Sequence, residues 1–167
     1  MPCRFAPLTL HDQPAVVQHL LELDADDRAL RFNTTAPDNA IVGYCARWNF
    51  AGDIVEGAWE GDQLIGVIHL PVFRAGADLI GELGVSVASG SRKRRIATGL
   101  ALRALENGRN LGLDRVYINF LTRNRPMMCL ARRFTGDITI EGDETVAIIR
   151  MDATPDRNAV ETPVAVA

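Results

Sequence analysis

The stretch Ile80 to Leu105, IGELGVSVASGSRKRRIATGLALRAL, determines how the rest of the chain is organised. In its first half, apolar and polar residues alternate as far as Val87, which is the pattern of a strand whose side chains point to opposite faces in turn. In its second half, apolar residues recur every three or four positions from Ile96, which is the pattern of a helix. The stretch therefore predicts a strand, a short polar loop over 88–91, and a helix.

Four cations stand at the junction between this loop and the helix: Arg92, Lys93, Arg94 and Arg95. The N–H groups in the first turn of a helix have no partner within the helix, and the helix dipole favours negative charge there. Cations are unfavourable at this position, so their presence favours a bound polyphosphate, which helix N-termini bind readily. A solvated basic turn is the alternative that the spacing leaves open.

This stretch resembles motif A of the GNAT superfamily, the acyl-CoA-dependent N-acetyltransferases, whose pattern is Arg/Gln-x-x-Gly-x-Gly/Ala at a strand-to-helix junction. Arg92 matches the first position and Ala97 the last. Arg95 stands where the family has its central glycine, and Lys93 stands where many members have another. Because glycine lets a backbone approach a pyrophosphate closely, we expect the loop to work only if Arg95 keeps a helical backbone conformation.

A second segment carries the same resemblance. After the predicted strand RVYINFLT, the residues from Asn124 to Phe134 are similar to the family's motif B, an asparagine followed by a short helix beside the cofactor, and Pro126 suits the first helical turn. The segment DDRALRF, Asp26 to Phe32, resembles a bacterial branch that includes protein-lysine acetyltransferase domains. Over Cys3 to Met151, the resemblance implies an α+β (mixed α/β) GNAT fold. Its central sheet is mixed, mostly antiparallel, has six to seven strands splayed between strands 4 and 5, and is flanked by about four helices.

The N-terminal part is less regular. A strand is predicted over Cys3 to Leu10, and Thr9 to Asp12 offer capping chemistry for a helix through Leu23. Asp24 to Asp27 is interpreted as an acidic break, either a solvated loop or a rim that attracts a cationic amine. Asp38 is expected to cap a further helix, through residue 48. A meander of two strands over 53–73, the second interrupted by a proline, leads to the central strand.

Length and composition fit a single domain. The 167 residues contain 47% hydrophobic and 23% charged residues, typical of a globular protein, and we expect one domain over 1–151 and a disordered tail over 152–167. The net charge of −3 makes the basic loop a local feature. Three widely spaced cysteines without a C-x-x-C pair, and no signal peptide, indicate a cytoplasmic protein. No apolar run approaches the ~18 residues of a membrane span.

The resemblance implies transfer of an acetyl (acyl) group from acetyl-CoA to a primary amine, by direct attack in a ternary complex. An alkylammonium with a pKa of about 10.4 must lose a proton first, and a positioned carboxylate can remove it. Glu82 is the candidate base, because an acid within an apolar strand is unfavourable unless it is partnered or used, and the family often places its base here. The alternative is a Glu82 that forms a salt bridge with an arginine on a neighbouring element.

The resemblance also implies how acetyl-CoA, the expected co-substrate, is bound. Strand backbone would pair with the pantetheine arm, the loop N–H groups would bind the pyrophosphate, Asn124 would anchor the arm, and Arg92 or Arg125 would reach the ribose phosphate. No metal is expected, since the three histidines lack ligand spacing. The cofactor-binding candidates are Val85, Ser86, Val87, Arg92, Lys93, Arg94, Arg95, Ile96, Ala97, Thr98, Asn124 and Arg125.

Three matters stay open. The family's tyrosine acid, seven residues after the motif B asparagine, is replaced by Ala131, and Cys129 is either a small core residue or an alternative acid or nucleophile. A catalytically weak acyl-CoA sensor or interaction module is a second possible function. Nucleic-acid binding through the arginines is a third, against which the acidity and the 6% aromatic content count. The acceptor could be a small-molecule amine or a protein lysine, no nucleic-acid or membrane partner is expected, and a homodimer is common in the family.

Overall fold

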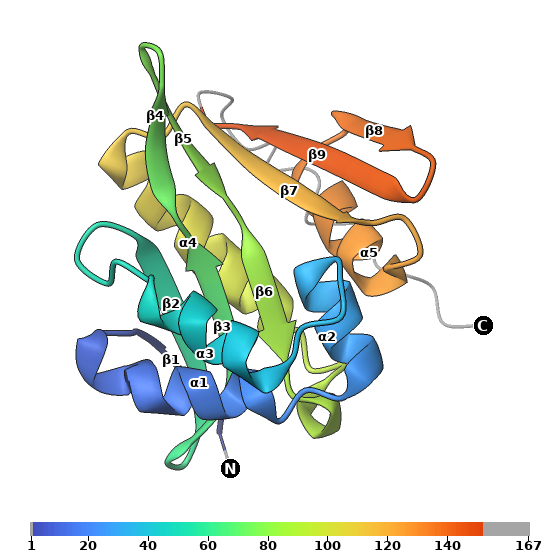
Figure 1. Ribbon diagram of the computed structural model, residues 1–167. Helices are drawn as coiled ribbons and strands as arrows, with labels where there is room; N and C mark the ends of the chain where they lie inside the picture. Colours follow the sequence, from blue (N-terminus) through green and yellow to red (C-terminus); the bar gives the residue numbers. More distant parts are fainter. Residues whose placement is uncertain (1, 152–167) are drawn as a thin grey trace.

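The computed structural model describes residues 2–151, so the predicted tail over 152–167 lies outside the described part of the chain. Within residues 2–151 the chain forms nine strands and five α-helices (Figure 1). In chain order the elements are β1 (Arg4–Pro7), α1 (Gln13–Leu21), α2 (Ala25–Phe32), α3 (Asp38–Ala46), β2 (Ile54–Glu60), β3 (Gln63–Leu70), β4 (Val72–Ala75), β5 (Asp78–Glu82), β6 (Gly84–Val87), α4 (Ile96–Leu111), β7 (Arg115–Leu121), α5 (Arg125–Phe134), β8 (Ile138–Glu141) and β9 (Glu144–Arg150).

The strands form two sheets, ordered β1-β2-β3-β6 and β4-β5-β7-β9-β8. Every pair is antiparallel except β5 and β7, which are parallel. Pro71 separates β3 from β4 and Leu83 separates β5 from β6, so the nine strands of the described chain follow seven extended paths. The predicted mixed, mostly antiparallel α+β fold is confirmed, with five α-helices where about four were expected.

The long strand predicted at the start of the central stretch is divided at Leu83. Before this residue, β5 pairs with β7, and Leu83 itself donates its N–H to the carbonyl of Tyr117 at 2.8 Å. After it, β6 leaves β7 and pairs with β3 instead. The two sheets consequently diverge between β6 and β7, which is the splay that the family resemblance implied (Figure 1).

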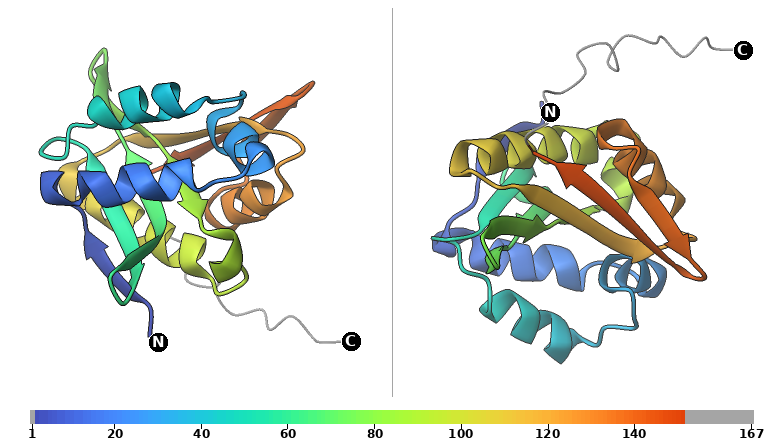
Figure 2. Two further views of the ribbon diagram at one scale, coloured as in Figure 1. Left: turned by 60° about the horizontal axis from the view of Figure 1, so that its bottom comes forward. Right: turned by 90° about the horizontal axis from the view of Figure 1, so that it is seen from above.

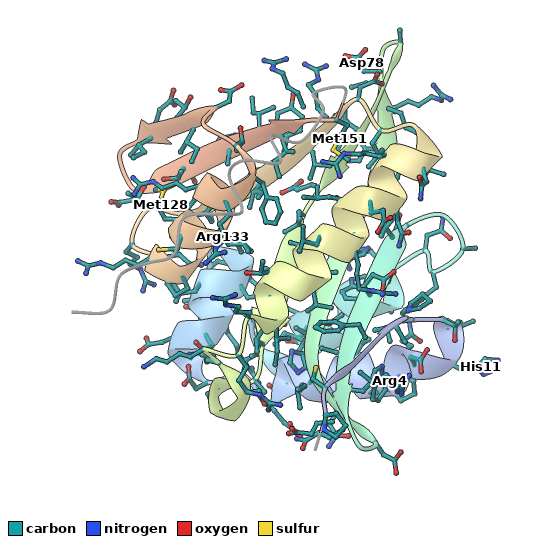
Figure 3. The ribbon with its side chains drawn as sticks, turned by 180° about the vertical axis from the view of Figure 1, so that it is seen from behind. Arg4, His11, Asp78, Met128, Arg133 and Met151 are labelled. Atoms are coloured by element: carbon teal, nitrogen blue, oxygen red, sulfur yellow. The ribbon has the colours of Figure 1, made fainter. Side chains whose placement is uncertain are left out.

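Helices cover both faces of these sheets. Seen from above, α4 and α5 lie on one face, and α1 and α3 lie on the other (Figure 2, right). Leu100 of α4 belongs to one buried cluster with Ile68 of β3, and Val16 of α1 belongs to a second one with Ile41 of α3. Figure 3 views the first of these faces, with α4 and α5 in front of the sheets.

The N-terminal segment differs from three of the predictions made for it. Asp12 Oδ2 accepts the N–H of Thr9 at 2.8 Å, but this contact caps the 3-10 turn Leu10–Asp12 that precedes α1, and α1 has no side-chain cap of its own. The acidic break is wrong, because Asp24 caps α2 by accepting the N–H of Asp27 at 2.8 Å. Asp38 does not cap α3, since Pro37 holds the N-cap position and Asp38 forms an ion pair with Arg28 at 2.7 Å.

The basic residues lie before the helix, not in its first turn. A short 3-10 turn, Ser89–Ser91, is followed by Arg92–Arg95 in loop conformation, and α4 begins only at Ile96. The helix therefore begins about one turn later than the sequence predicted. Gly112 ends α4 in the left-handed region with φ 86°.

Candidate active site

A cavity of about 830 Å³ lies where β6 and β7 separate, and α2, α5 and the N-terminus of α4 complete its walls. This volume is typical of a site for a small molecule or cofactor. All the residues predicted for the site line the cavity except two, Arg94 and Arg125. The cavity is therefore the place where sequence motifs far apart in the chain come together.

One wall of the cavity is an unpaired strand edge. Ala88 donates its N–H to the carbonyl of Ile65 at 2.8 Å, toward β3. Because backbone groups alternate between the two sides of a strand, the N–H and C=O groups of Val85 and Val87 face the other way, into the gap before β7. Polar groups of a strand edge that meet no second strand are free to pair with an extended ligand.

The loop before α4 has the backbone conformation that glycine usually supplies. Lys93 has φ 63°, and Arg95 has φ 58° and ψ 20°, both in the left-handed region. The condition stated for this loop, that Arg95 keeps a right-handed helical conformation, is therefore not met. The loop retains the shape that the family's glycines favour, although each non-glycine residue there costs about 1–2 kcal/mol.

This strain gives a test by stability. Arg95→Gly should raise the free energy of unfolding by about 1 kcal/mol over that of Arg95→Ala, because only glycine has no Cβ to clash in the left-handed region. The midpoint of thermal unfolding should differ by about 2–4 °C between these two variants, which both lack the guanidinium. Equal midpoints would contradict the left-handed backbone at this residue.

The first turn of α4 presents unpaired donors to the cavity. The first helical bond runs from the N–H of Gly99 to the carbonyl of Arg95 at 3.0 Å. The N–H groups of Ile96, Ala97 and Thr98 precede it and have no partner within the helix. Donors that point out of a helix N-terminus are suited to an anion.

The four cations of the loop divide into two pairs. Arg92 contacts Asp27 of α2 at 2.5 Å, and Arg94 contacts Glu60 of β2 at 2.9 Å, outside the cavity. The Arg94 hydrogen bond lowers the pKa of Glu60. Lys93 and Arg95 are exposed, line the cavity and have no ion pair within residues 2–151. Of the four loop cations, these two are the ones available to a ligand.

Three further candidates are placed as follows. The hydroxyl of Ser86 lies 2.9 Å from Nε2 of the buried His19, so its side chain serves the core while its backbone borders the cavity. Burial lowers the pKa of His19. Asn124 caps α5, with its Oδ1 accepting the N–H of Met127 at 3.2 Å. Arg125 is exposed and outside the cavity.

Glu82 is the last residue of β5, exposed and facing the cavity. Its Oε1 accepts a hydrogen bond from Nδ2 of Asn119 on β7 at 3.0 Å. The alternative of a salt bridge with an arginine is wrong, since no cation within residues 2–151 lies within ion-pair distance of Glu82. Its place at the strand end, not within an apolar run, explains how the carboxylate stays accessible.

A hydrogen-bonded chain that the sequence did not predict forms another wall. Nη2 of Arg31 donates to the hydroxyl of Tyr44 at 2.9 Å, and this hydroxyl lies 3.3 Å from Nδ1 of His69. Nε2 of His69 lies 2.8 Å from Oδ2 of Asp53. Arg31, Tyr44 and His69 line the cavity. The four residues come from different segments, and no local pattern marks them as a group.

The protonation of this chain follows from its partners. His69 is 4% exposed and stacks on Trp48 with ring centroids 3.9 Å apart. Burial lowers the pKa of His69, and Asp53 opposes the lowering. A neutral imidazole donates from Nε2 to Asp53 and accepts at Nδ1 from Tyr44, so the Tyr44 oxygen is left to accept from Arg31.

Two positions of motif B were considered as donors of a proton to a leaving thiolate. Ala131 is fully buried, so the family's tyrosine position carries no polar group. Cys129 is exposed on α5, which corrects its interpretation as a core residue. Within residues 2–151, no group of three or more His, Cys, Asp or Glu side chains could hold a metal ion. In the same range, no helix combines the length and apolarity needed to cross a bilayer.

Comparisons with known proteins agree with this architecture. The model of the acetyltransferase (GNAT) family matches residues 9–136, and no curated protein sequence matches the chain. The GNAT domain of Streptomyces PAT (S. lividans) has a TM-score of 0.74 at 18% identity, over 89% of this chain and 90% of that one.

Two other solved structures are also similar. For yncA from Salmonella typhimurium, solved with acetyl-CoA, the TM-score is 0.69 at 15% identity, over 93% and 98% of the chains. For a chain of the NatC complex, solved with Gag peptide and CoA, the values are 0.64 and 15%, over 90% and 99%. These likenesses concern the fold, and the family match covers most of the sequence. The chain belongs to the GNAT family of acetyltransferases.

Proposed function

We propose that the protein transfers an acetyl (acyl) group from acetyl-CoA to a primary amine, by direct attack in a ternary complex. The observation that carries this proposal is the division of the central strand at Leu83. It places an unpaired strand edge, the N-terminus of α4 and the carboxylate of Glu82 around one cavity. An extended thioester and an amine can then meet in the same space.

The residues present fit acetyl-CoA. The amide groups of its pantetheine arm would pair with Val85 and Val87 as an added strand does. Its pyrophosphate would accept hydrogen bonds from the N–H groups of the first turn of α4, beside Lys93 and Arg95. The neighbouring proteins solved with acetyl-CoA or CoA share this fold, which supports the assignment.

The chemistry follows from the same geometry. Glu82, directly or through water, removes a proton from the substrate ammonium, and the neutral amine nitrogen attacks the thioester carbon. The bond from carbon to nitrogen forms and the bond from carbon to sulfur breaks. A backbone N–H of β6 that faces the gap polarises the carbonyl oxygen. As the amide forms, the attacking nitrogen gives its second proton to water. The thiol has a pKa of about 8.5, so the thiolate can leave and take a proton from water in turn.

A second candidate is an acyl-CoA sensor with little turnover. The buried Ala131 favours it, because no hydroxyl stands at the family's acid position. This candidate predicts normal binding of acetyl-CoA and no acetylation of any amine. We also infer a cytoplasmic location from the cysteine usage.

The test of the proposed function is calorimetric titration with acetyl-CoA and with CoA, followed by an amine screen for free thiol release. We expect one-to-one binding in the micromolar range. Replacing Arg95 by glutamate should weaken the affinity, whereas replacing Arg74, which is exposed outside the cavity, by glutamate should leave it unchanged. Absence of binding at millimolar ligand would overturn both candidates. Binding without thiol release from any amine would favour the sensor.

A further inference from the structure

Arg31 on α2 lies in the wall of the cavity and has no acidic partner among the described residues. Within residues 2–151 no carboxylate lies within ion-pair distance of it. In the part of the chain that the structure describes, its buried Nε has no hydrogen-bond partner, and its side chain makes one hydrogen bond, from Nη2 to the hydroxyl of Tyr44. Leaving a buried donor of a charged group unpaired is unfavourable, so the position calls for a reason.

Arg28, one turn earlier on the same helix, shows how an arginine is satisfied for structural purposes. Each of its guanidinium nitrogens donates hydrogen bonds, to the carbonyls of Leu21, Leu23 and Ala36 and to the carboxylate of Asp38. Arg31 instead packs against the rings of Phe32 and Tyr44, with its Cζ 5.1 and 5.5 Å from their centroids. The rings orient the guanidinium but neutralise none of its charge.

The guanidinium lies against the point where the central strand divides. A Cβ added to Gly84 would lie 2.6 Å from Nη2 of Arg31, so the guanidinium lies directly against the backbone of Gly84. Glu82 is two residues earlier, about 6.6 Å along an extended chain. A cation and a carboxylate thus flank the place proposed for the reaction.

The chain of Tyr44, His69 and Asp53 fixes this cation in position. Tyr44 accepts from Arg31, and its own contact to His69 connects it to the carboxylate of Asp53. Burial lowers the pKa of His69, and the nearby charge of Arg31 adds to this lowering. A pre-oriented cation at this place would bind a substrate anion with little loss of side-chain freedom.

We infer that the acceptor is an amine that carries a carboxylate close to the amino group, as an α-amino acid does, with Arg31 binding the carboxylate and Glu82 facing the ammonium. This inference rests on the proposed function. Arginine forms paired hydrogen bonds with a carboxylate, and the terminal nitrogens of Arg31 are the donors that can reach one, because Nε is buried. Polyamines and aminoglycosides would bring further positive charge next to Arg31 and are disfavoured.

The test compares pairs of acceptors that differ only in this charge. Acetyl transfer is measured for the proteinogenic α-amino acids, β-alanine and γ-aminobutyrate, each beside its carboxamide, with spermidine and a lysine peptide with blocked termini as further acceptors. We expect kcat/KM for the preferred acid to exceed that for its amide by about 10- to 100-fold. The amide has the lower amine pKa and is more often neutral, so deprotonation cannot produce this preference.

Variants connect the preference to Arg31. Arg31→Gln should reduce the ratio of acid to amide to near one, mainly through a fall in the kcat/KM of the acid. Tyr44→Phe removes only the hydroxyl next to Nη2 and keeps the ring, so it should weaken the preference for the acid. It serves as the second variant if Arg31→Gln does not fold. Arg74→Gln, which removes an exposed charge outside the cavity, should leave the ratio as in the wild type.

The outcomes separate this inference from the proposed function. Transfer to amides, spermidine or the peptide at rates equal to the acids would overturn the inference and leave the acetyltransferase standing. A preference that persists in Arg31→Gln, or acetyl-CoA binding without transfer to any acid, would also overturn it. Absence of acetyl-CoA binding would overturn the proposed function itself.

Discussion

Glu82→Gln is expected to lower kcat/KM for acetyl transfer at pH 7 by about 100-fold or more, with little change in the affinity for acetyl-CoA. Glutamine keeps the size of the side chain and can still accept from Asn119, but it has no charge with which to take a proton from the substrate ammonium. The loss should narrow as the pH rises toward the pKa of the free amine, because more of the amine is then already neutral.

The measurement is the pH profile of kcat/KM for wild type, Glu82→Gln and Glu141→Gln. Glu141 is an exposed glutamate on β8 that does not line the cavity, so its variant controls for the loss of one charge. Calorimetric affinities for acetyl-CoA show whether the cavity is intact. Equal profiles for the two variants would remove Glu82 from the mechanism.

Val85→Pro is expected to reduce kcat by about 100-fold, the effect of losing one backbone donor that stabilises a developing oxyanion. The N–H of Val85 is the first on β6 that faces the gap, because the N–H of Leu83 is already bonded to Tyr117. Proline removes this donor without breaking a bond to β3, and strand edges tolerate proline where the N–H points outward.

The matched control is Val85→Ala, which shortens the same side chain but keeps the N–H. A large fall in turnover for proline alone would identify the backbone group as the source. Ser86→Pro should instead lower stability, because the N–H of Ser86 points toward β3. Similar turnover for Val85→Pro and Val85→Ala would show that this N–H takes no part in the reaction.

The local pattern of apolar and polar residues predicted most helices and strands correctly, but it misplaced where they begin and end around the cavity. The period of the residues after Ile96 indicated α4 correctly, whereas the basic residues before it were assigned to its first turn. Nothing in the period of the sequence distinguishes a loop of cations from a helix of cations. The ion pairs of Arg92 with Asp27 and of Arg94 with Glu60 connect this loop to α2 and β2, which are distant in sequence.

The candidate residues near motif A were predictable because a strand, a loop and a helix in succession bring them to one place. The sequence did not predict that Arg31, Tyr44 and His69 form part of the site, because each lies in a separate helix or strand whose local pattern explains it without reference to the others. Their hydrogen bonds join α2, α3 and β3, so only the packing of these elements shows that they act together.

The sequence by itself determined the succession of strands and helices, the family, and the motif that meets the cavity. These depend on the period of apolar residues and on residue types at short spacing, both of which act locally. The tertiary structure decided where the central strand divides, because its first half pairs with β7 in one sheet and its second half pairs with β3 in the other. It also decided the left-handed backbone of Arg95 and the exposure of Arg31 to the cavity, because contacts between segments far apart in the chain fix both.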